Sequence, residues 1–453
     1  MEKKVAFLVF SDWKKSRRKN GSFDGVSNIG AYMLIDVAER AGIKIGFCSV
    51  DSAREYDIVL VSLTSIYDML AFYRDVRLHR DWQKPRKFRV LCGGFGMQNP
   101  FPVVDYVDSF WFGRCEDEFV NWLTIEDYEH ESLMYPDRPK VCKIHQVDCL
   151  YPYSFELHTD HAEHNHFTEK IMGCPNKCLF CHFSFSRKHI KTSDHYNLKE
   201  YGHATQELDM FNLEDLDYAV AKTTIGLDGL SERLRYLINK PISDELLFNT
   251  IVNMSQKSQV KGEAFYLKLY NIAGYETETE EDMQSFFDVV KSTVPHLRKR
   301  CLLVLHTTPL HPSPATPLVY APVNLHTTFD QVRGKMFFKD GTPDQYRGDK
   351  MLAMHSTYNE SNWSLVESVI VERFSEAHRK LLDLICFNKK FNSLKSADKI
   401  RYCEQHFDMT DLLRRYETSE QVPSWVCESY LGWDKIRKMR DVMVKKMDAF
   451  ANK

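Results

Sequence analysis

The 453-residue sequence has no long hydrophobic run, little net charge, and few glycines and prolines. Its first apolar run, Val5 to Phe10, is far shorter than a secretion signal or the ~20 residues of a spanning helix. Only 19 glycines and 16 prolines exclude a collagen-like fibre, and 43% hydrophobic residues exclude a long disordered chain. A formal net charge of −3 does not favour a nucleic-acid partner. We therefore predict a cytoplasmic globular protein that binds no membrane.

Twelve cysteines are present, but a cytoplasmic protein is not expected to pair them as disulfides. Cys174, Cys178 and Cys181 lie within eight residues, whereas the others are scattered. This local cluster is the strongest functional signal in the sequence.

Length and hydrophobic periodicity predict an α/β protein of about three domains. Residues 1–125 alternate strand-like and helical stretches, which predicts a Rossmann-like parallel sheet with helices on both faces. The expected strands are 5–10, 43–50, 57–63, 88–92 and 109–112, with helices at 29–41 and 66–76. The strand ending at Cys92 runs into Gly93-Gly94-Phe95-Gly96, where we expect either a ligand or a plain tight turn.

Residues 126–167 form a polar connector that contains four closely spaced histidines: His158, His161, His164 and His166. Their spacing is compatible with metal binding, but a solvated linker is the simpler interpretation. No cysteine near them in sequence completes a zinc site.

Residues 168–325 resume the alternation and predict a partial (βα)6 barrel of the TIM type. The expected strands are 167–172, 218–225, 264–271 and 301–306, and the expected helices are 232–238, 243–258 and 280–293. Residues 326–453 are predicted to be mainly helical, with the longest helices at 365–387 and 433–450. No repeat of fixed period and no low-complexity tract is found.

The cysteines follow a C-x3-C-x2-C spacing after a strand. Three thiolates this close together suit a cubic iron–sulfur cluster, each binding one corner and leaving the fourth iron open. A zinc site is the alternative, but only His182 is a close fourth ligand. The spacing therefore favours a cluster.

With Phe180 just before the last cysteine, this motif resembles the signature of radical S-adenosylmethionine (SAM) enzymes. Two later stretches, 224–241 and 267–282, resemble the family's SAM-contacting segments in order and spacing. The resemblance implies a [4Fe-4S] cluster on Cys174, Cys178 and Cys181, with SAM at the open iron. It also implies a reductant such as flavodoxin or ferredoxin, and reductive cleavage of SAM to a 5′-deoxyadenosyl radical. That radical would modify an unknown substrate by methyl transfer or rearrangement.

The same resemblance assigns SAM contacts to five residues: Phe180, Asp228, Ser231, Arg235 and Gly274. Phe180 is expected near the adenine edge, and Asp228 as a hydrogen-bond acceptor. Ser231 and Arg235 are expected at the SAM carboxylate, and Gly274 where the backbone approaches the adenine. The family usually carries glutamate at the position of Asp228.

Two nearby residues complete this prediction. Arg233 is the other candidate for the ion pair with the SAM carboxylate. Glu278 is expected to order the start of the following helix rather than to touch the ligand.

The N-terminal domain is similar to the cobalamin-binding type that precedes many radical SAM cores. The D-x-H-x-x-G motif that supplies cobalamin's lower ligand is absent, and Asp24 to Gly30 stands at its place. The sequence therefore does not favour cobalamin, although the domain type admits it.

A methylthiotransferase acting on tRNA or protein is an alternative, and it needs a second cluster. Cys48, Cys92 and Cys115 lie at strand ends, but Phe10-Ser11-Asp12 stands where the first cysteine of that cluster is expected. Buried, inert thiols are the favoured interpretation. A non-catalytic scaffold with a structural cluster or zinc is the third alternative.

Overall fold

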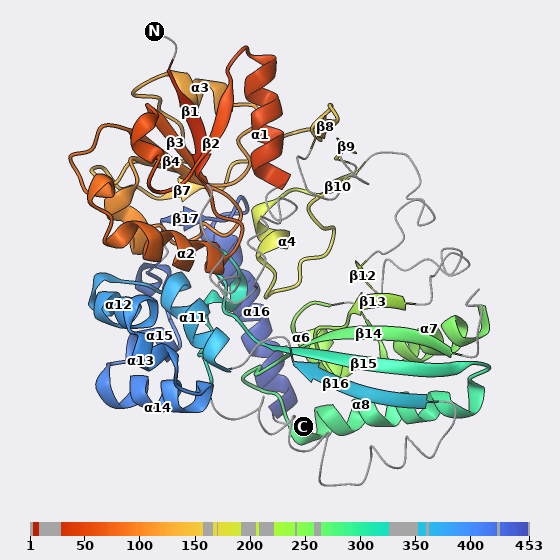
Figure 1. Cartoon of the computed structure of the whole chain (residues 1–453). Helices are drawn as coiled ribbons and strands as arrows, with labels where there is room; N and C mark the ends of the chain where they lie inside the picture. The colour runs from red at the N-terminus through yellow and green to blue at the C-terminus, as the bar shows by residue number, and fades with distance from the viewer. Residues whose placement is uncertain are drawn as a thin grey trace.

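The computed structural model describes two parallel sheets, a group of C-terminal helices and a long last helix (Figure 1). The described residues are 3–8, 29–156, 166–169, 171–191, 205–207, 222–240, 242–257, 264–325, 352–358, 362–423 and 426–451. The predicted α/β class is confirmed. No helix in these ranges is long and apolar enough to cross a membrane.

The first sheet has the strand order β2-β1-β3-β4-β5-β6, parallel except for β6. Its strands are β1 (Val5–Leu8), β2 (Ile45–Cys48), β3 (Ile58–Ser62), β4 (Arg89–Gly93), β5 (Ser109–Trp111) and β6 (Leu133–Met134). Alternate strand residues enter two separate cores. One core includes α2 (Ile66–Arg77), and the other includes α1 (Ile29–Arg40) and α3 (Phe119–Thr124). Helices therefore cover both faces, as predicted.

The glycine turn after β4 packs against the loop after β3. Leu63 N donates to Gly93 O at 2.8 Å, and Gly96 N donates to Leu63 O at 2.8 Å. Gly94 has φ +110°, and a Cβ there would lie 2.3 Å from Leu63 O. This close approach explains why the turn is built from glycine.

Gly94→Ala is expected to lower the free energy of unfolding by about 3 kcal/mol, because it adds both a strained φ and a backbone clash. The control is Gly30→Ala in α1, where an added Cβ meets nothing within 4 Å. We expect the control to stay within about 1 kcal/mol of wild type. Thermal unfolding of both variants measures the difference, and equal midpoints would contradict the assignment.

The second sheet is parallel and has the order β12-β13-β14-β15-β16. Its strands are β12 (Thr205–Glu207), β13 (Lys222–Gly226), β14 (Ala264–Ala273), β15 (Arg300–Pro309) and β16 (Leu352–Tyr358). Helices α7 (Asp244–Lys257) and α8 (Glu280–Thr293) pack in one core with β13, β14 and β15. The described strands form an open sheet, so the predicted closed or partly closed barrel is not confirmed.

Two predictions for this part are corrected. The expected strand at 167–172 is instead divided between β9 (His166–Phe167) and β10 (Ile171–Met172). Each pairs in its own two-stranded sheet, with β8 (Phe155–Glu156) and β11 (Ile190–Lys191) respectively. Strand β16 comes from the segment predicted to be mainly helical, because it pairs along β15.

The C-terminal helices are α11 (Asn362–Glu372), α12 (Arg379–Phe387), α13 (Lys389–Asn392), α14 (Ser396–His406), α15 (Thr410–Leu413) and α16 (Trp433–Ala451). The expected single helix at 365–387 is therefore wrong. It divides at Ser375, whose backbone N–H donates to His378 Nδ1 at 3.1 Å and begins a new turn. The helix expected at 433–450 is confirmed as α16.

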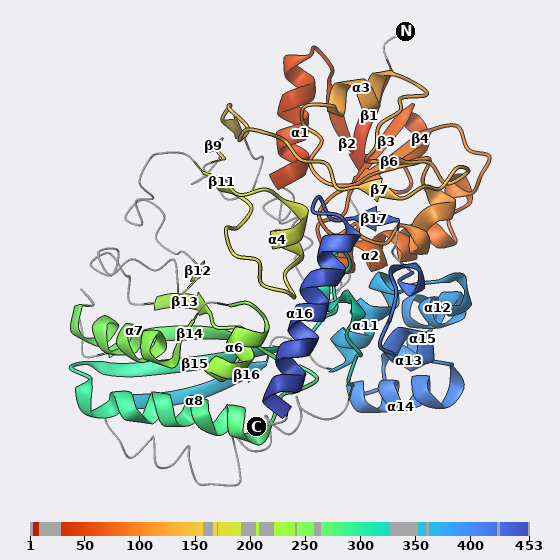
Figure 2. The same ribbon diagram turned by 180° about the vertical axis from the view of Figure 1, so that it is seen from behind.

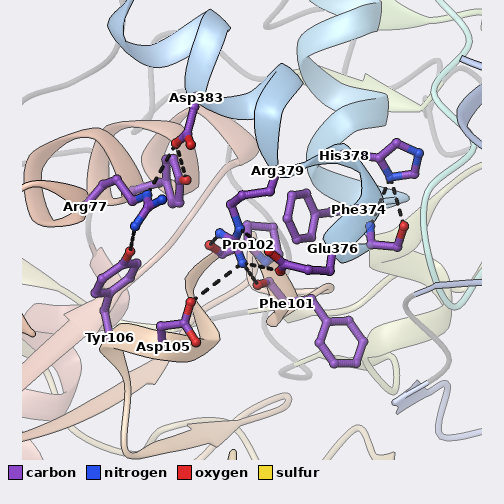
Figure 3. Close-up of polar contacts among 12 residues, drawn as sticks. Arg77, Phe101, Pro102, Asp105, Tyr106, Phe374, Glu376, His378, Arg379 and Asp383 are labelled. Atoms are coloured by element: carbon purple, nitrogen blue, oxygen red, sulfur yellow. Dashed lines mark hydrogen bonds and ion pairs between the residues drawn. The ribbon is translucent and has the colours of Figure 1, made fainter. Parts of the chain in front are cut away.

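Arg379 joins α12 to the first domain (Figure 3). Its Nη1 donates to Pro102 O at 2.7 Å, its Nη2 pairs with Glu376 at 2.9 Å, and its guanidinium lies 4.7 Å from the Phe374 ring centroid. Residues of α2 and the C-terminal helices share one hydrophobic core. The helical region is thus packed directly on the first domain.

Candidate functional site

The cysteine loop, residues 173–181, joins β10 to the short helix α4 (His182–Ser186). Gly173 opens the loop with φ +68°, and a Cβ there would lie 2.2 Å from Lys188 O. Cys178 is buried, whereas Cys174 and Cys181 are partly exposed. The loop is therefore anchored at its start, and two of its three cysteines are only partly buried.

Backbone hydrogen bonds fix the loop against α6 (Glu232–Leu237) and the 3-10 turn η9 (Pro317–Tyr320). Leu179 N donates to Ile238 O at 2.9 Å, and Leu318 N donates to Leu179 O at 3.2 Å. Asn239 Nδ2 donates to Lys177 O at 3.0 Å. These bonds hold the loop beside the end of α6.

Helix α16 runs between the second sheet and the other C-terminal helices in both views (Figures 1 and 2). Its residues Trp433 and Ile436 share a core with Leu179, Phe185 and residues of α6. Just before α16, Ser429 Oγ donates to Phe185 O at 2.7 Å, and Tyr430 OH accepts from Lys177 Nζ at 2.7 Å. The chain's last elements therefore support the cysteine loop.

Phe180 packs at the edge of this core and is only partly buried. Its ring is thus near the cysteines and retains some exposed surface. The predicted adenine contact stays a prediction.

Lys240 is the cation at the cysteine loop. It is 2% exposed, and its Nζ donates to Asp228 Oδ2 at 2.8 Å. Burial lowers the pKa of Lys240, while the nearby thiols of Cys178, Cys181 and Cys174 act in the opposite direction. All three thiols therefore lie within electrostatic range of the Lys240 ammonium.

Burial also shifts the pKa values of Cys178 and Asp228. It raises the pKa of the Cys178 thiol to about 12, and that of Asp228 to about 7. Asp228 follows β13 with φ +60°, and its carbonyl accepts from Tyr275 OH at 2.7 Å. An acidic group at the carboxyl end of a parallel strand is in the usual position for ligand contact.

The residues predicted to bind the SAM carboxylate have hydrogen-bond partners within the protein. Arg235 is fully buried and donates to the carbonyls of Gly229, Leu230 and Ile242, and it pairs with Asp244. A guanidinium with four partners acts as a structural brace. Its predicted SAM contact has no support in this arrangement and stays a prediction.

Ser231 and Arg233 both bind Asp282. Ser231 Oγ also caps α6 by accepting from Leu234 N at 3.1 Å, and Arg233 Nη2 donates to Thr277 O at 2.7 Å. The three side chains tie α6 to the start of α8. Their roles toward SAM likewise stay predictions.

Gly274 has φ +99°, and the nearest atom to an added Cβ would be Leu310 N at 4.0 Å. Its N–H donates to Glu278 Oε2 at 2.6 Å, and burial raises the pKa of Glu278 to about 7. Glu278 therefore holds the Gly274 turn, while Thr279 and Asp282 cap α8. The space beside Gly274 is compatible with a ligand.

The donor chemistry of the loop fits an iron–sulfur cluster. No three His, Cys, Asp or Glu side chains of the described residues are close enough to share a single metal ion. A cubic cluster does not need such closeness, because each sulfur binds a different iron. Three cysteines on one short loop therefore suit a cubic cluster better than a zinc site.

The thiols considered for a second cluster are Cys48, Cys92 and Cys115. Burial raises the pKa of each, so the neutral thiol is favoured. Burial raises the pKa of the Cys178 thiol in the same way, so protonation does not separate these thiols from the loop cysteines. Cys48 and Cys92 pack in one core and Cys115 packs against the other, which does not favour a shared cluster. His158, His161 and His164 lie outside the described residues, as does the side chain of His166.

Sequence reasoning missed Lys240, which lies in a polar Asn-Lys-Pro stretch after α6. Nothing local distinguishes it from a solvated surface lysine. Its proximity to the cysteine loop depends on how α6 packs beside that loop.

No family model matches the sequence. An uncharacterized protein of Methanocaldococcus jannaschii is 22% identical over 422 residues, which cover 78% of this chain and 93% of that protein. Solved structures of the cobalamin-dependent S-adenosylmethionine radical enzyme OxsB align at 10% identity. Their TM-scores are 0.25 for the apo form, 0.28 with aqua-cobalamin, and 0.28 with aqua-cobalamin and SAM. The alignments cover 89%, 92% and 100% of this chain but only 61%, 64% and 62% of those chains. These scores are too low to establish a shared fold.

Proposed function

We propose that the chain is a radical SAM enzyme that modifies a substrate not yet identified. The observation that carries the proposal is the position of the three-cysteine loop, which backbone hydrogen bonds hold beside the end of α6, near the buried Lys240–Asp228 pair. Cys174, Cys178 and Cys181 would hold a [4Fe-4S] cluster. When bound, that cluster supplies the electron for reductive cleavage of SAM.

The residues around the loop would bind and orient SAM. Lys240 offers a buried ammonium for its carboxylate, and Asp228 offers an acceptor for its polar groups. The ammonium of Lys240 pairs with Asp228, just as the guanidinium groups of Arg233 and Arg235 pair with carboxylates. We favour Lys240 because it is buried within electrostatic range of all three loop thiols, whereas Arg235 is enclosed by backbone carbonyls. Phe180 and the Gly274 turn would contact the adenine.

The direct test is anaerobic reconstitution of the full chain with iron and sulfide, followed by addition of SAM and dithionite. We expect about four iron atoms per chain and formation of 5′-deoxyadenosine and methionine. A chain that binds iron but produces no 5′-deoxyadenosine would instead be a scaffold with a structural cluster. A chain that takes up only zinc would refute the proposal.

The iron count separates the methylthiotransferase alternative. A second cluster would bring the count to about eight per chain. The division of Cys48, Cys92 and Cys115 between two separate cores supports the lower count. Cobalamin is not favoured, and an absorption spectrum after incubation with aqua-cobalamin and gel filtration tests that expectation.

A further inference from the structure

A cavity of about 430 Å³ lies at the carboxyl edge of the first sheet, apart from the Lys240 site. It is bounded by the ends of β1, β3, β4 and β5 and by the first residues of α1. In the order β2-β1-β3-β4-β5, the chain reverses direction across the sheet between β1 and β3. Open α/β sheets bind ligands at that position.

The glycine turn of β4 forms one wall of this cavity, through Gly93, Gly94 and Phe95. The sequence left a ligand and a tight turn as alternatives there. The turn packs tightly against Leu63 and also faces the cavity, so the two interpretations are compatible.

The lining is mainly apolar and aromatic. Its aromatic members are Phe7, Phe95, Trp111, Phe119, Trp122 and Phe155. A cavity of this size and lining suits a drug-sized organic molecule.

Four charged residues line the cavity: Arg114, Arg187, Glu116 and Glu169. The two arginines differ in their partners. Arg114 is ion-paired with both Glu116 and Glu169, at 2.6 Å to Glu169. Arg187 makes none of the hydrogen bonds or ion pairs found among the described residues. Its guanidinium instead lies 5.0 Å from the Phe95 ring centroid and 5.1 Å from that of Phe183.

The position of Arg187 has an energetic cost. Burial lowers its pKa to about 10, and the nearby charge of Arg114 acts in the same direction. The carboxylates of Glu116 and Glu169 act the other way but are engaged by Arg114. A guanidinium fixed by two rings and left with free N–H donors is a ready partner for an oxyanion.

We propose that this cavity binds a small, mainly aromatic organic anion whose carboxylate or phosphate pairs with Arg187. The apolar walls would hold the rings, and the two aromatic side chains of Phe95 and Phe183 would keep the guanidinium in place. This inference concerns binding to the first domain, and it does not require a cluster on the cysteine loop.

The test uses the full chain without reconstitution and two fluorescent probes of similar shape. One is the anion 8-anilinonaphthalene-1-sulfonate, and the other is the uncharged N-phenyl-1-naphthylamine. Arg187→Met is expected to weaken the anionic probe about tenfold or more and to leave the uncharged probe within about twofold. Arg54→Met is the matched control, because Arg54 has a 65% exposed side chain and does not line the cavity.

If circular dichroism shows that Arg187→Met does not fold, Arg187→Lys is measured in its place. That variant keeps the charge and should keep most of the affinity for the anionic probe. Equal loss of both probes in a folded Arg187→Met variant would overturn the anion site. Failure of both probes to bind the wild type would overturn the cavity itself. Stoichiometric displacement of the probe by aqua-cobalamin would show that the occupant is a corrinoid, which contradicts the proposed ligand class.

Discussion

Cys178→Ala is expected to abolish the iron–sulfur chromophore and to reduce 5′-deoxyadenosine formation by at least about a hundredfold. Cys178 is the buried member of the three thiols, and the loop has no fourth cysteine to replace it. Loss of one ligand leaves one corner of the cube without protein support. Iron and sulfide assays after anaerobic reconstitution, with the SAM cleavage assay, measure both effects.

The matched control is Cys301→Ala, which removes a similarly buried thiol from β15. It should retain about four iron atoms per chain and wild-type SAM cleavage, with a stability loss of about 1 kcal/mol. If Cys178→Ala kept the chromophore, or if the control lost it equally, the assignment of the loop as the cluster site would be wrong.

Lys240→Met is expected to lower stability by about 3–5 kcal/mol, because it leaves the Asp228 carboxylate buried without its cation. The double variant Lys240→Met/Asp228→Asn should recover most of that loss, since it removes the unpaired charge. Thermal unfolding of the unreconstituted chain measures both variants. Equal midpoints for the single and double variants would contradict a coupled pair.

The same pair gives a pH dependence with a defined sign. Burial raises the pKa of Asp228 from 3.8 to about 7, so the folded state binds a proton more readily than the unfolded state. Stability from that proton is present below 3.8 and is lost as the pH rises toward 7. The wild type should therefore lose stability over this window, and Asp228→Asn, which has no group that titrates there, should not.

Lys240→Met should also impair SAM cleavage by about tenfold or more while the iron content is retained. This separates a role in binding SAM from a role in cluster assembly. Loss of iron together with activity would assign Lys240 to the support of the loop.

The N-terminal sheet could be predicted because its signals are local. Short apolar runs alternate with helical stretches, and each strand of β1 to β5 overlaps a range expected from periodicity, with β4 ending one residue beyond its range. The cysteine motif is likewise a matter of close spacing in sequence. Such features depend on few long-range contacts.

The rest depends on packing that the sequence does not display. Strand β16 has a weak pattern and forms by pairing with β15. Lys240 and Arg235 lie five residues apart and look interchangeable as basic residues, yet one faces the thiols and the other is enclosed by backbone carbonyls. Which one faces the thiols is decided by how the end of α6 packs beside the cysteine loop.

The support of the cysteine loop by α16 has a consequence for biosynthesis. Lys177 and Tyr430 are 253 residues apart in the chain, and Phe185 and Ser429 are 244 apart. Chains emerge from the ribosome with the N-terminal end first. The loop therefore gains these neighbours only after residues 429 and 430 have emerged, and the proposed cluster would be inserted after that point.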